Sequence, residues 1–215
     1  MPLNLACLHT AESNVSLFDA AAAALPGGAL LLTHQVRPDL LRAPTPETLA
    51  EAANLLRDMA KSADAVLLTC STIGAAAAMA SDAGCPVLRA DAALAEAATR
   101  AGGALEVLYA APTTLEPTRI IFEEAAARNG ATIHMHLVEG AWALFHAGEM
   151  MAYHASIAAK AYSLPGRVVL AQASMAGAAA LLPHAPPLTV PTISVMAGAR
   201  AALAARASRG TGAAR

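Results

Sequence analysis

Short apolar runs alternate along this chain with longer stretches in which apolar residues recur every three or four positions. The short runs predict β-strands, and the longer stretches predict amphipathic α-helices. In the amino-terminal half we expect strands at 3–10, 29–36, 65–70 and 86–90, and helices at 15–24, 47–62, from 75 to about 82, and 92–100. Ser13 is the expected N-cap of the first helix, which should end at Pro26-Gly27-Gly28.

The carboxyl-terminal half repeats this order of elements. We expect strands at 105–110, 132–138, 168–172 and 188–192, and helices at 116–128, 144–162, from 175 onward, and a last one that ends at about 205. Residues 208–215 lack periodicity and predict a disordered tail. The alternation predicts an α/β fold in which helices cover both faces of parallel sheets, and such sheets bind ligands at the carboxyl ends of their strands.

A shift of 102 residues aligns the chain with itself. Gly28-Ala29 then falls on Gly130-Ala131, His34 on His136, Val36 on Val138, Val66 on Val168, Leu68 on Leu170, and Cys70 on Gln172. We therefore expect two similar doubly wound parallel-sheet halves, 1–103 and 104–207, related by a pseudo-twofold axis. The ligand cleft is expected between the halves, with Cys70 and Gln172 facing one cavity.

Composition and charge favour a small molecule as the partner. The 215 residues are 56% hydrophobic and 3% aromatic, which is ample for a core of closely packed small side chains. The 14 basic and 16 acidic residues form no basic block, so neither nucleic acid nor a membrane is an expected partner. Three widely spaced cysteines, with no CxxC, signal peptide or membrane-spanning run, predict a soluble cytoplasmic protein.

The most informative stretch is 65–78, AVLLTCSTIGAAAA, which predicts a buried strand, a polar turn and a helix start. Cys70 lies in the turn, where free backbone N–H groups at a helix start favour a thiolate and can bind an anion. The other interpretation of Cys70 is a small hydrophobic residue buried at a strand end. The local sequence leaves both open.

Two further groups of polar residues have a structural and a functional interpretation. Thr113, Thr114 and Thr118 gather at a helix start, where threonine commonly serves as an N-cap but could also bind a carboxylate. His134 with His136, and His146 with Glu149, are spaced so that each pair could hold a metal, although no third ligand accompanies either. We favour carboxylate binding for the threonines and a surface or interface role for the histidines.

The remaining motifs exclude several chemistries. GxGxxG, P-loop and HExxH patterns do not occur, so the sequence predicts no cofactor and no metal. Ser174 lies in AQASMAG, which lacks the preceding glycine of a GxSxG nucleophile turn and does not favour a serine hydrolase. Cys7, inside the first strand, and Cys85, before Pro86, have no evident reason to ionise.

The chain resembles the aspartate/glutamate/hydantoin racemase superfamily, which includes arylmalonate decarboxylase and maleate isomerase. The resemblance covers nearly the whole chain and is carried by TCST at 69–72, PTTLEPT at 112–118 and LAQASMA at 170–176. In the hydantoin racemase branch the last segment would read like LGCAGM. Gln172 therefore takes the position of the second catalytic cysteine, which this sequence lacks.

The resemblance implies cofactor-free proton transfer at a carbon next to a carboxylate, between two thiols that face each other. It implies that Cys70 acts as acid or base and that hydroxyls and backbone N–H groups hold the enolate. A neutral amide at Gln172 can only accept or donate hydrogen bonds. We assign Cys70 and Gln172 as the catalytic positions. The expected substrate-binding residues are His9, Thr10, Asn14, Ser71, Thr72, Thr113, Thr114, Thr118 and Ser174.

Three functions remain open at this point. The first is a racemase, isomerase or decarboxylase that uses Cys70 with His9, Ser174 or water in place of the missing thiol. The second is a covalent isomerase in which Cys70 attacks an unsaturated substrate. The third is a binding protein for a small carboxylate that has lost the chemistry. The expected partners are a small-molecule carboxylate and further copies of the chain in a homo-oligomer.

Overall fold

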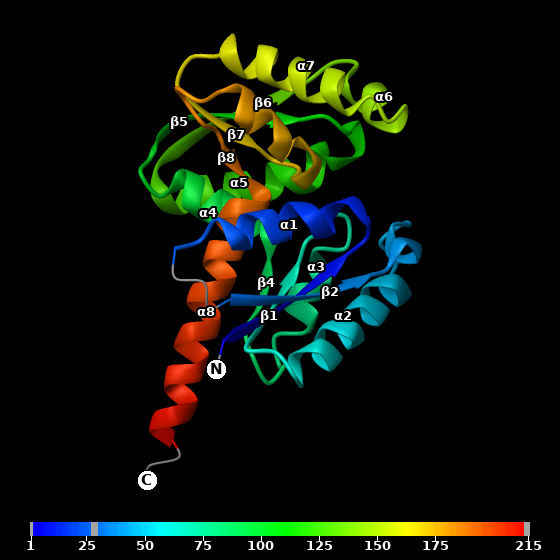
Figure 1. The fold of residues 1–215 in the computed structure, drawn as a ribbon, viewed down its shortest axis with the longest axis vertical. Helices are drawn as coiled ribbons and strands as arrows, with labels where there is room; N and C mark the ends of the chain where they lie inside the picture. Colours follow the sequence, from blue (N-terminus) through cyan, green and yellow to red (C-terminus); the bar gives the residue numbers. More distant parts are fainter. Residues whose placement is uncertain (1, 27–29, 213–215) are drawn as a thin grey trace. The chain divides into compact units, whose positions relative to one another are not determined.

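The computed structural model describes residues 2–26 and 30–212, without the side chains of 210–212. The chain divides into two compact units: unit 1 comprises Met1–Ala90 and Ser194–Arg215, and unit 2 comprises Asp91–Ile193. Each unit contains a four-stranded parallel sheet with helices packed against it, as the alternating pattern predicts (Figure 1).

Unit 1 is built on the strand order β2-β1-β3-β4. Its strands are β1 (Leu3–His9), β2 (Leu30–Val36), β3 (Ala65–Leu68) and β4 (Val87–Arg89). Its helices are α1 (Ser13–Ala23), η1 (Pro38–Leu40), α2 (Pro46–Ala60), α3 (Ala75–Met79) and most of α8 (Val190–Gly212). Ala6, Leu8, Val66 and Leu68 belong to one buried cluster with residues of α2 and α3.

Unit 2 repeats the topology in the order β6-β5-β7-β8. Its strands are β5 (Gly103–Tyr109), β6 (Ala131–Leu137), β7 (Arg167–Leu170) and β8 (Leu188–Thr189). Its helices are α4 (Ala90–Thr99), η2 (Pro112–Thr114), α5 (Leu115–Asn129), α6 (Ala141–His146), α7 (Met150–Tyr162) and η3 (Ala173–Leu181). Tyr153 and Ile157 of α7 pack with Leu108, Leu170 and Met175 in its buried cluster.

The sheet registers show that the shift between the two units changes along the chain. Leu8 pairs with Leu68 in unit 1, and Leu108 pairs with Leu170 in unit 2, so the shift is 100 for β1 and 102 for β3. Cys70 and Gln172 are therefore equivalent positions, each two residues beyond its strand.

The same comparison corrects two of the sequence matches, those of His34 and Val36; the counterpart of Val36 is Leu137 rather than Val138. The shift is 101 for β2, because Leu30 and Ala131 open the matching ladders, and the counterpart of His34 is Met135 rather than His136. Gly28 and Ala29, which were predicted to match Gly130 and Ala131, lie outside the described residues.

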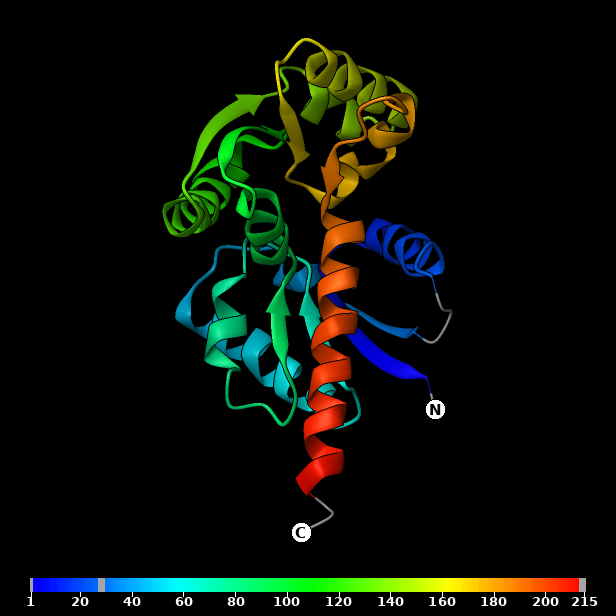
Figure 2. The same cartoon turned by 90° about the vertical axis from the view of Figure 1, so that its left-hand side faces the viewer.

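The two compact units divide the chain after Ala90 and after Ile193, whereas the sequence predicted halves of 1–103 and 104–207. Helix α4 belongs to unit 2, because Asn129 of α5 donates a hydrogen bond from Nδ2 to Thr99 Oγ1 at 2.9 Å and Arg128 pairs with Glu96 at 3.1 Å. From Ser194 onward, helix α8 belongs to unit 1. It runs beside the unit 1 strands (Figure 2). The helix extends to Gly212, although the sequence predicted a disordered tail from Ser208.

Helix α8 is fixed to unit 1 by a close approach and by charge. A Cβ on Gly198 would lie 2.7 Å from Leu5 Cδ2, so glycine allows the helix to pack directly on β1. Farther along, Arg206 and Arg209 pair with Asp64, which also accepts a hydrogen bond from the Asn4 N–H at 3.0 Å. Burial alone would raise the pKa of Asp64, but these donors bring it below its ordinary value of 3.8.

We expect Asp64→Asn to lower the free energy of unfolding by about 1 kcal/mol at pH 7, because the partly exposed Arg206 and Arg209 lose a charged acceptor. Since the pKa of Asp64 is lowered by folding, its stabilising effect is complete above pH 3.8 and is lost as the pH falls through the lower folded-state value. Urea unfolding at pH 7 and in acid measures this. Asp58→Asn, in an exposed pair with Lys61, is the control. A loss equal at both pH values would contradict the role of the charge.

Three local predictions differ from the structure. The predicted helix at 144–162 is two helices, because Gly148 adopts a left-handed backbone with φ of 74° between α6 and α7. The predicted strand at 188–192 ends at Thr189, where α8 begins at Val190. Ser13 is the first residue of α1 rather than its N-cap, which is Glu12, without a side-chain capping bond.

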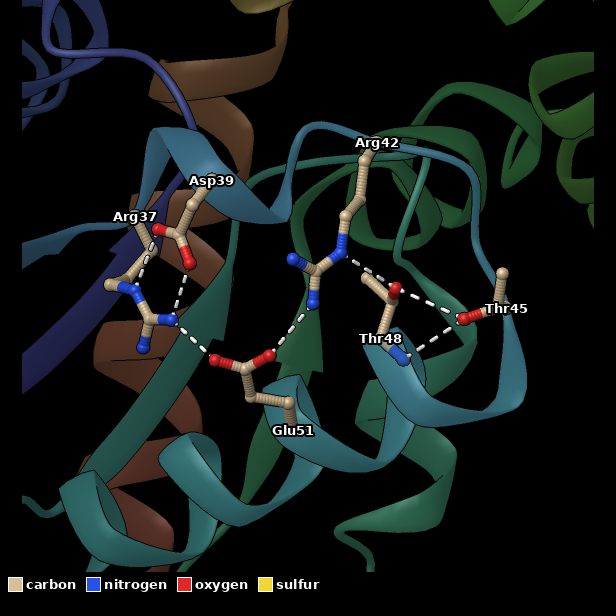
Figure 3. Close-up of polar contacts among 6 residues, drawn as sticks. All are labelled: Arg37, Asp39, Arg42, Thr45, Thr48 and Glu51. Atoms are coloured by element: carbon tan, nitrogen blue, oxygen red, sulfur yellow. Dashed lines mark hydrogen bonds and ion pairs between the residues drawn. The ribbon is translucent and has the colours of Figure 1, made fainter.

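A charged network holds the connection between β2 and α2 (Figure 3). The two carboxylate oxygens of Glu51 bind Arg37 and Arg42, the latter at 2.9 Å, and Arg37 also donates from Nε to Asp39 at 2.8 Å. Thr45 caps α2 by accepting the Thr48 N–H at 3.3 Å. Leu40, in the same connection, is buried in the core cluster of unit 1, and the charged side chains at the end of β2 bind one another within this loop.

Candidate functional site

Cys70 lies at the carboxyl edge of the unit 1 sheet, two residues beyond β3. The backbone carries it into a turn after Thr69, whose N–H donates to the Leu8 carbonyl of β1 at 3.1 Å. The Cys70 residue is 9% exposed and packs in the same buried cluster as Leu8 and Ile73. The thiol is therefore placed at the sheet edge, as predicted, but mostly within the apolar core.

The helix that follows Cys70 is shorter than the sequence predicted, because it ends at Met79 rather than at about residue 82. Helix α3 comprises five residues and begins at Ala75, after a turn in which the Gly74 N–H donates to the Ser71 carbonyl at 3.1 Å. Ser71 and Thr72 are half-buried in this turn. Cys70 therefore lies before the turn rather than at a helix start, and the surroundings of the thiol are set by the turn.

Arg89, which the sequence analysis did not single out, lies against this same turn. It is the last residue of β4, and a Cβ on Gly74 would lie 2.2 Å from its Cζ. Glycine at 74 thus lets the guanidinium reach the backbone that follows Cys70. Arg89 could have been identified from the sequence, because it is a basic residue at the end of the strand that follows the Cys70 strand.

His9, predicted to bind substrate, is fully buried and both of its ring nitrogens have partners. Nδ1 lies 2.8 Å from Thr69 Oγ1, and Nε2 lies 2.9 Å from Nδ1 of His34. Burial and the neighbouring His34 lower the pKa of His9 to about 4, against an opposite effect of Asp19. His9 is therefore neutral at pH 7 and hydrogen-bonded within unit 1, and its part in substrate binding stays a prediction.

Thr10 and Asn14 complete the predicted residues of unit 1. Thr10 directly follows β1 and lies at the same sheet edge as Cys70, because β1 and β3 are neighbours in the sheet. Asn14 is in the first turn of α1. Both residues are buried.

In unit 2, Gln172 occupies two backbone donors at the carboxyl end of β5. Its Oε1 accepts the Ala110 N–H at 2.6 Å and the Ala111 N–H at 3.0 Å. Two converging N–H groups are the kind of donor that holds a carboxylate or an enolate oxygen. The side-chain carbonyl of Gln172 thus stands where an anionic oxygen could bind, and it cannot transfer a proton.

Ser174 is engaged with α7 by both its side chain and its backbone. Its Oγ lies 2.8 Å from the Tyr153 hydroxyl, and its carbonyl oxygen lies 3.1 Å from His154 Nε2. Burial raises the pKa of Tyr153 to about 12, against the effect of the Ser174 hydrogen bond, so the phenol is neutral at pH 7. Neither partner is evident from the sequence, because helical periodicity identifies Tyr153 only as a core position.

The predicted threonines lie close together in the chain but differ in exposure. Thr113 is exposed, Thr114 is half-buried and donates from its hydroxyl to the Ala111 carbonyl at 2.7 Å, and Thr118 is buried in α5. Ala111 thus connects Thr114 and Gln172 at one edge of the unit 2 sheet. The first two threonines lie in η2, before α5, and Thr114 is the N-cap residue without a side-chain capping bond.

The predicted histidine pairs have other partners. His134 and His136 of β6 bind the two carboxylate oxygens of the buried Glu106, at 3.1 and 2.5 Å. His146 lies against the ring of Trp142, with centroids 4.7 Å apart. Within the described part of the chain, a cluster of three metal-binding side chains is formed instead by Cys7, His9 and His34.

A cavity in unit 1 of about 430 Å³ lies away from the Cys70 turn. It is lined mainly by apolar residues of α1 and β2 and by Asp19, so it carries little chemistry. We place more weight on the sheet edge, where the polar groups converge. In the described residues, none of the helices has the length and apolar character needed to cross a membrane.

Comparison with known proteins rests on structure. No protein-family model matches the sequence, and no curated protein matches it. An aspartate racemase from Picrophilus torridus is similar with a TM-score of 0.72 and 9% identity, over 93% of this chain and 94% of that one. An allantoin racemase from Klebsiella pneumoniae has a TM-score of 0.66 and 15% identity, over 91% and 86%.

A glutamate racemase from Thermus thermophilus is similar with a TM-score of 0.60 and 16% identity, over 94% of this chain and 81% of that one. These likenesses extend over nearly the whole chain and agree with the resemblance drawn from the sequence motifs. The chain therefore has the same fold as these three solved racemases.

Proposed function

We propose that the protein is a cofactor-independent enzyme of the racemase and isomerase type, which transfers a proton through Cys70 next to a carboxylate or carbonyl. The proposal rests chiefly on a thiol at the carboxyl end of β3 in a fold shared with aspartate, allantoin and glutamate racemases. The substrate class is a small amino acid, dicarboxylate or hydantoin-like compound, which the names of these neighbours suggest.

In the proposed reaction the Cys70 thiolate removes a proton from the carbon next to the carboxylate, and the thiol later returns one. Carbon acids beside a carboxylate are weak, so the developing enolate needs hydrogen-bond donors to stabilise it. The hydroxyls and backbone of Ser71 and Thr72 are suitable donors. The Arg89 guanidinium, beside the same turn, is suited to bind the substrate carboxylate as a planar pair of donors.

Gln172 restricts which reactions this enzyme can perform. Racemisation needs proton transfer on both faces of one carbon, and the amide at Gln172 has no proton to exchange at a useful rate. Because its Oε1 accepts hydrogen bonds from the N–H groups of Ala110 and Ala111, the proposed role of Gln172 is to occupy or orient these two backbone donors. A single thiol therefore favours reactions in which the carbon is protonated from one face only. These are proton exchange, isomerisation and decarboxylation, and isomerisation can also follow a covalent route through Cys70.

The second candidate is a small-carboxylate binding protein without catalysis, which the burial of Cys70 and the engagement of Gln172 favour. Alkylation of Cys70 separates the two candidates. The chain is treated with iodoacetamide in the presence and absence of aspartate, glutamate, allantoin and small dicarboxylates, and each cysteine is followed by mass spectrometry. An enzyme of the proposed type should be labelled at Cys70. One of the ligands should protect Cys70 from labelling, and the protein should turn that same ligand over.

Cys7 and Cys85 serve as internal references in the same experiment, because both are buried and burial is the leading cause that raises the pKa of each thiol. Protection of Cys70 without turnover would support the binding protein instead. Equal labelling of Cys70 with and without every ligand, together with an absence of turnover, would contradict both candidates.

A further inference from the structure

The buried face of β1 and β2 brings together three metal-binding side chains that the proposed reaction does not use. The ligand atoms of Cys7, His9 and His34 all lie within 4.8 Å of one another. Cys7 and His9 are two residues apart on β1 and so share a face of the sheet. His34 is the register partner of Cys7 on β2.

The outer nitrogen of each histidine has an oxygen partner. His34 Nε2 lies 3.0 Å from Asp19 Oδ1, and His9 Nδ1 lies 2.8 Å from Thr69 Oγ1. The Thr69 hydroxyl is in turn 3.0 Å from the Leu8 carbonyl, to which it can donate. Histidine metal ligands commonly donate their other ring N–H to a carboxylate or another oxygen, which fixes the ring and its tautomer.

Two proton arrangements satisfy these outer partners. In one, Thr69 donates to His9 Nδ1 and the His9 Nε2–H donates to His34 Nδ1; in the other, the inner nitrogens need a cation. If Thr69 donates to Leu8, His9 Nδ1–H donates to Thr69 and His34 Nε2–H donates to Asp19. The lone pairs of His9 Nε2 and His34 Nδ1 then face each other at 2.9 Å. A bound proton or a metal ion between the rings removes that repulsion.

We propose that Cys7, His9 and His34 form a binding site for a borderline-soft transition-metal cation of the Zn²⁺ class, with Asp19 and Thr69 as outer partners. One thiolate and two imidazoles are ligands that Zn²⁺ prefers. Two nitrogens on a tetrahedral zinc are about 3.3 Å apart for Zn–N bonds of about 2.0–2.1 Å, so small ring movements suffice. This site does not use the Cys70 thiol as a ligand and does not depend on the proposed function.

Cobalt binding to the full chain tests the site, because tetrahedral Co²⁺ bound to a thiolate gives visible absorption and a thiolate-to-metal charge-transfer band. Chelator-treated protein is titrated with Co²⁺ and then with Zn²⁺. We expect one equivalent of Co²⁺ to bind with a thiolate band, and Zn²⁺ to displace it. The band should vanish in Cys7→Ser and persist in the control Cys85→Ser.

Asp19→Ala provides a variant that does not alter the buried ligands, because Asp19 has a side chain 56% exposed on α1. We expect it to weaken Co²⁺ binding about 10- to 100-fold. Asp58→Ala, an exposed carboxylate paired with Lys61, should leave binding unchanged. Circular dichroism checks the fold of each variant.

Three results would overturn the proposal. They are an absence of stoichiometric Co²⁺ binding by the wild-type chain, a thiolate band that survives Cys7→Ser, and a band lost in Cys85→Ser instead. If Cys7→Ser does not fold, Asp19→Ala decides, and an unchanged affinity for Co²⁺ would then show that the cluster is a hydrogen-bonded network only.

Discussion

Cys70→Ala is expected to reduce proton exchange at the substrate carbon by at least about 10²–10⁴-fold, the range that a positioned acid or base contributes. Cys70 lies at the sheet edge, two residues beyond β3, and is the thiol next to Ser71 and Thr72 in the chain. Exchange is measured by proton NMR in deuterated solvent with the substrate that the ligand screen identifies. The loss should appear in the rate of turnover rather than in substrate affinity.

Folding of the variant is checked by its melting temperature, because Cys70 packs with Leu8 and Ile73 in the core and truncation creates a small void. Cys85→Ala, in the same cluster, is the matched control for that void. It should melt at a similar temperature and retain exchange. Full activity in Cys70→Ala would remove the proposed mechanism, whatever the activity of the control.

Gln172→Cys is expected to give the chain a racemase activity that the wild type lacks. The substitution places a thiol at the position equivalent to Cys70 in the second unit. It also frees the Ala110 and Ala111 N–H groups from Oε1, so that they can bind an anionic oxygen. Interconversion of enantiomers, followed by chiral chromatography, should rise from background by an order of magnitude or more.

Gln172→Ala separates the two effects of that change. It frees the same backbone donors without adding a thiol, so exchange should stay on one face. Both variants should lose about 1–3 kcal/mol of stability in the ligand-free state, because two buried donors lose their acceptor. Racemisation by Gln172→Ala as fast as by Gln172→Cys would show that the thiol is not the reason for the gain.

Much of the architecture could be predicted because it depends on patterns within short segments of the sequence. Apolar runs and helical periodicity give the strands and most helices, and the constant order of elements gives the duplication. Cys70 and Gln172 match correctly because the shift of 102 holds for β3 and β7. The same shift fails for His34 and Val36, because the connection between β2 and β3 is one residue shorter than the equivalent connection between β6 and β7.

The rest depends on contacts between distant segments, which a single sequence does not contain. Nothing near Gln172 predicts that its amide binds Ala110 and Ala111, about 60 residues away. The grouping of Cys7 with His34 needs the register of two strands, and the return of α8 to unit 1 needs Asp64 and Gly198. That Cys70 and Gln172 serve one ligand stays a prediction.

The most direct test of the central claim is solvent deuterium incorporation by the wild-type chain, measured separately for each enantiomer of the substrate. A single thiol at Cys70 predicts that one enantiomer gains deuterium with retention of configuration, while the other exchanges far more slowly and neither is converted into the other. Equal exchange of both enantiomers with their interconversion would contradict this account, because a second residue would then supply the proton that Gln172 cannot.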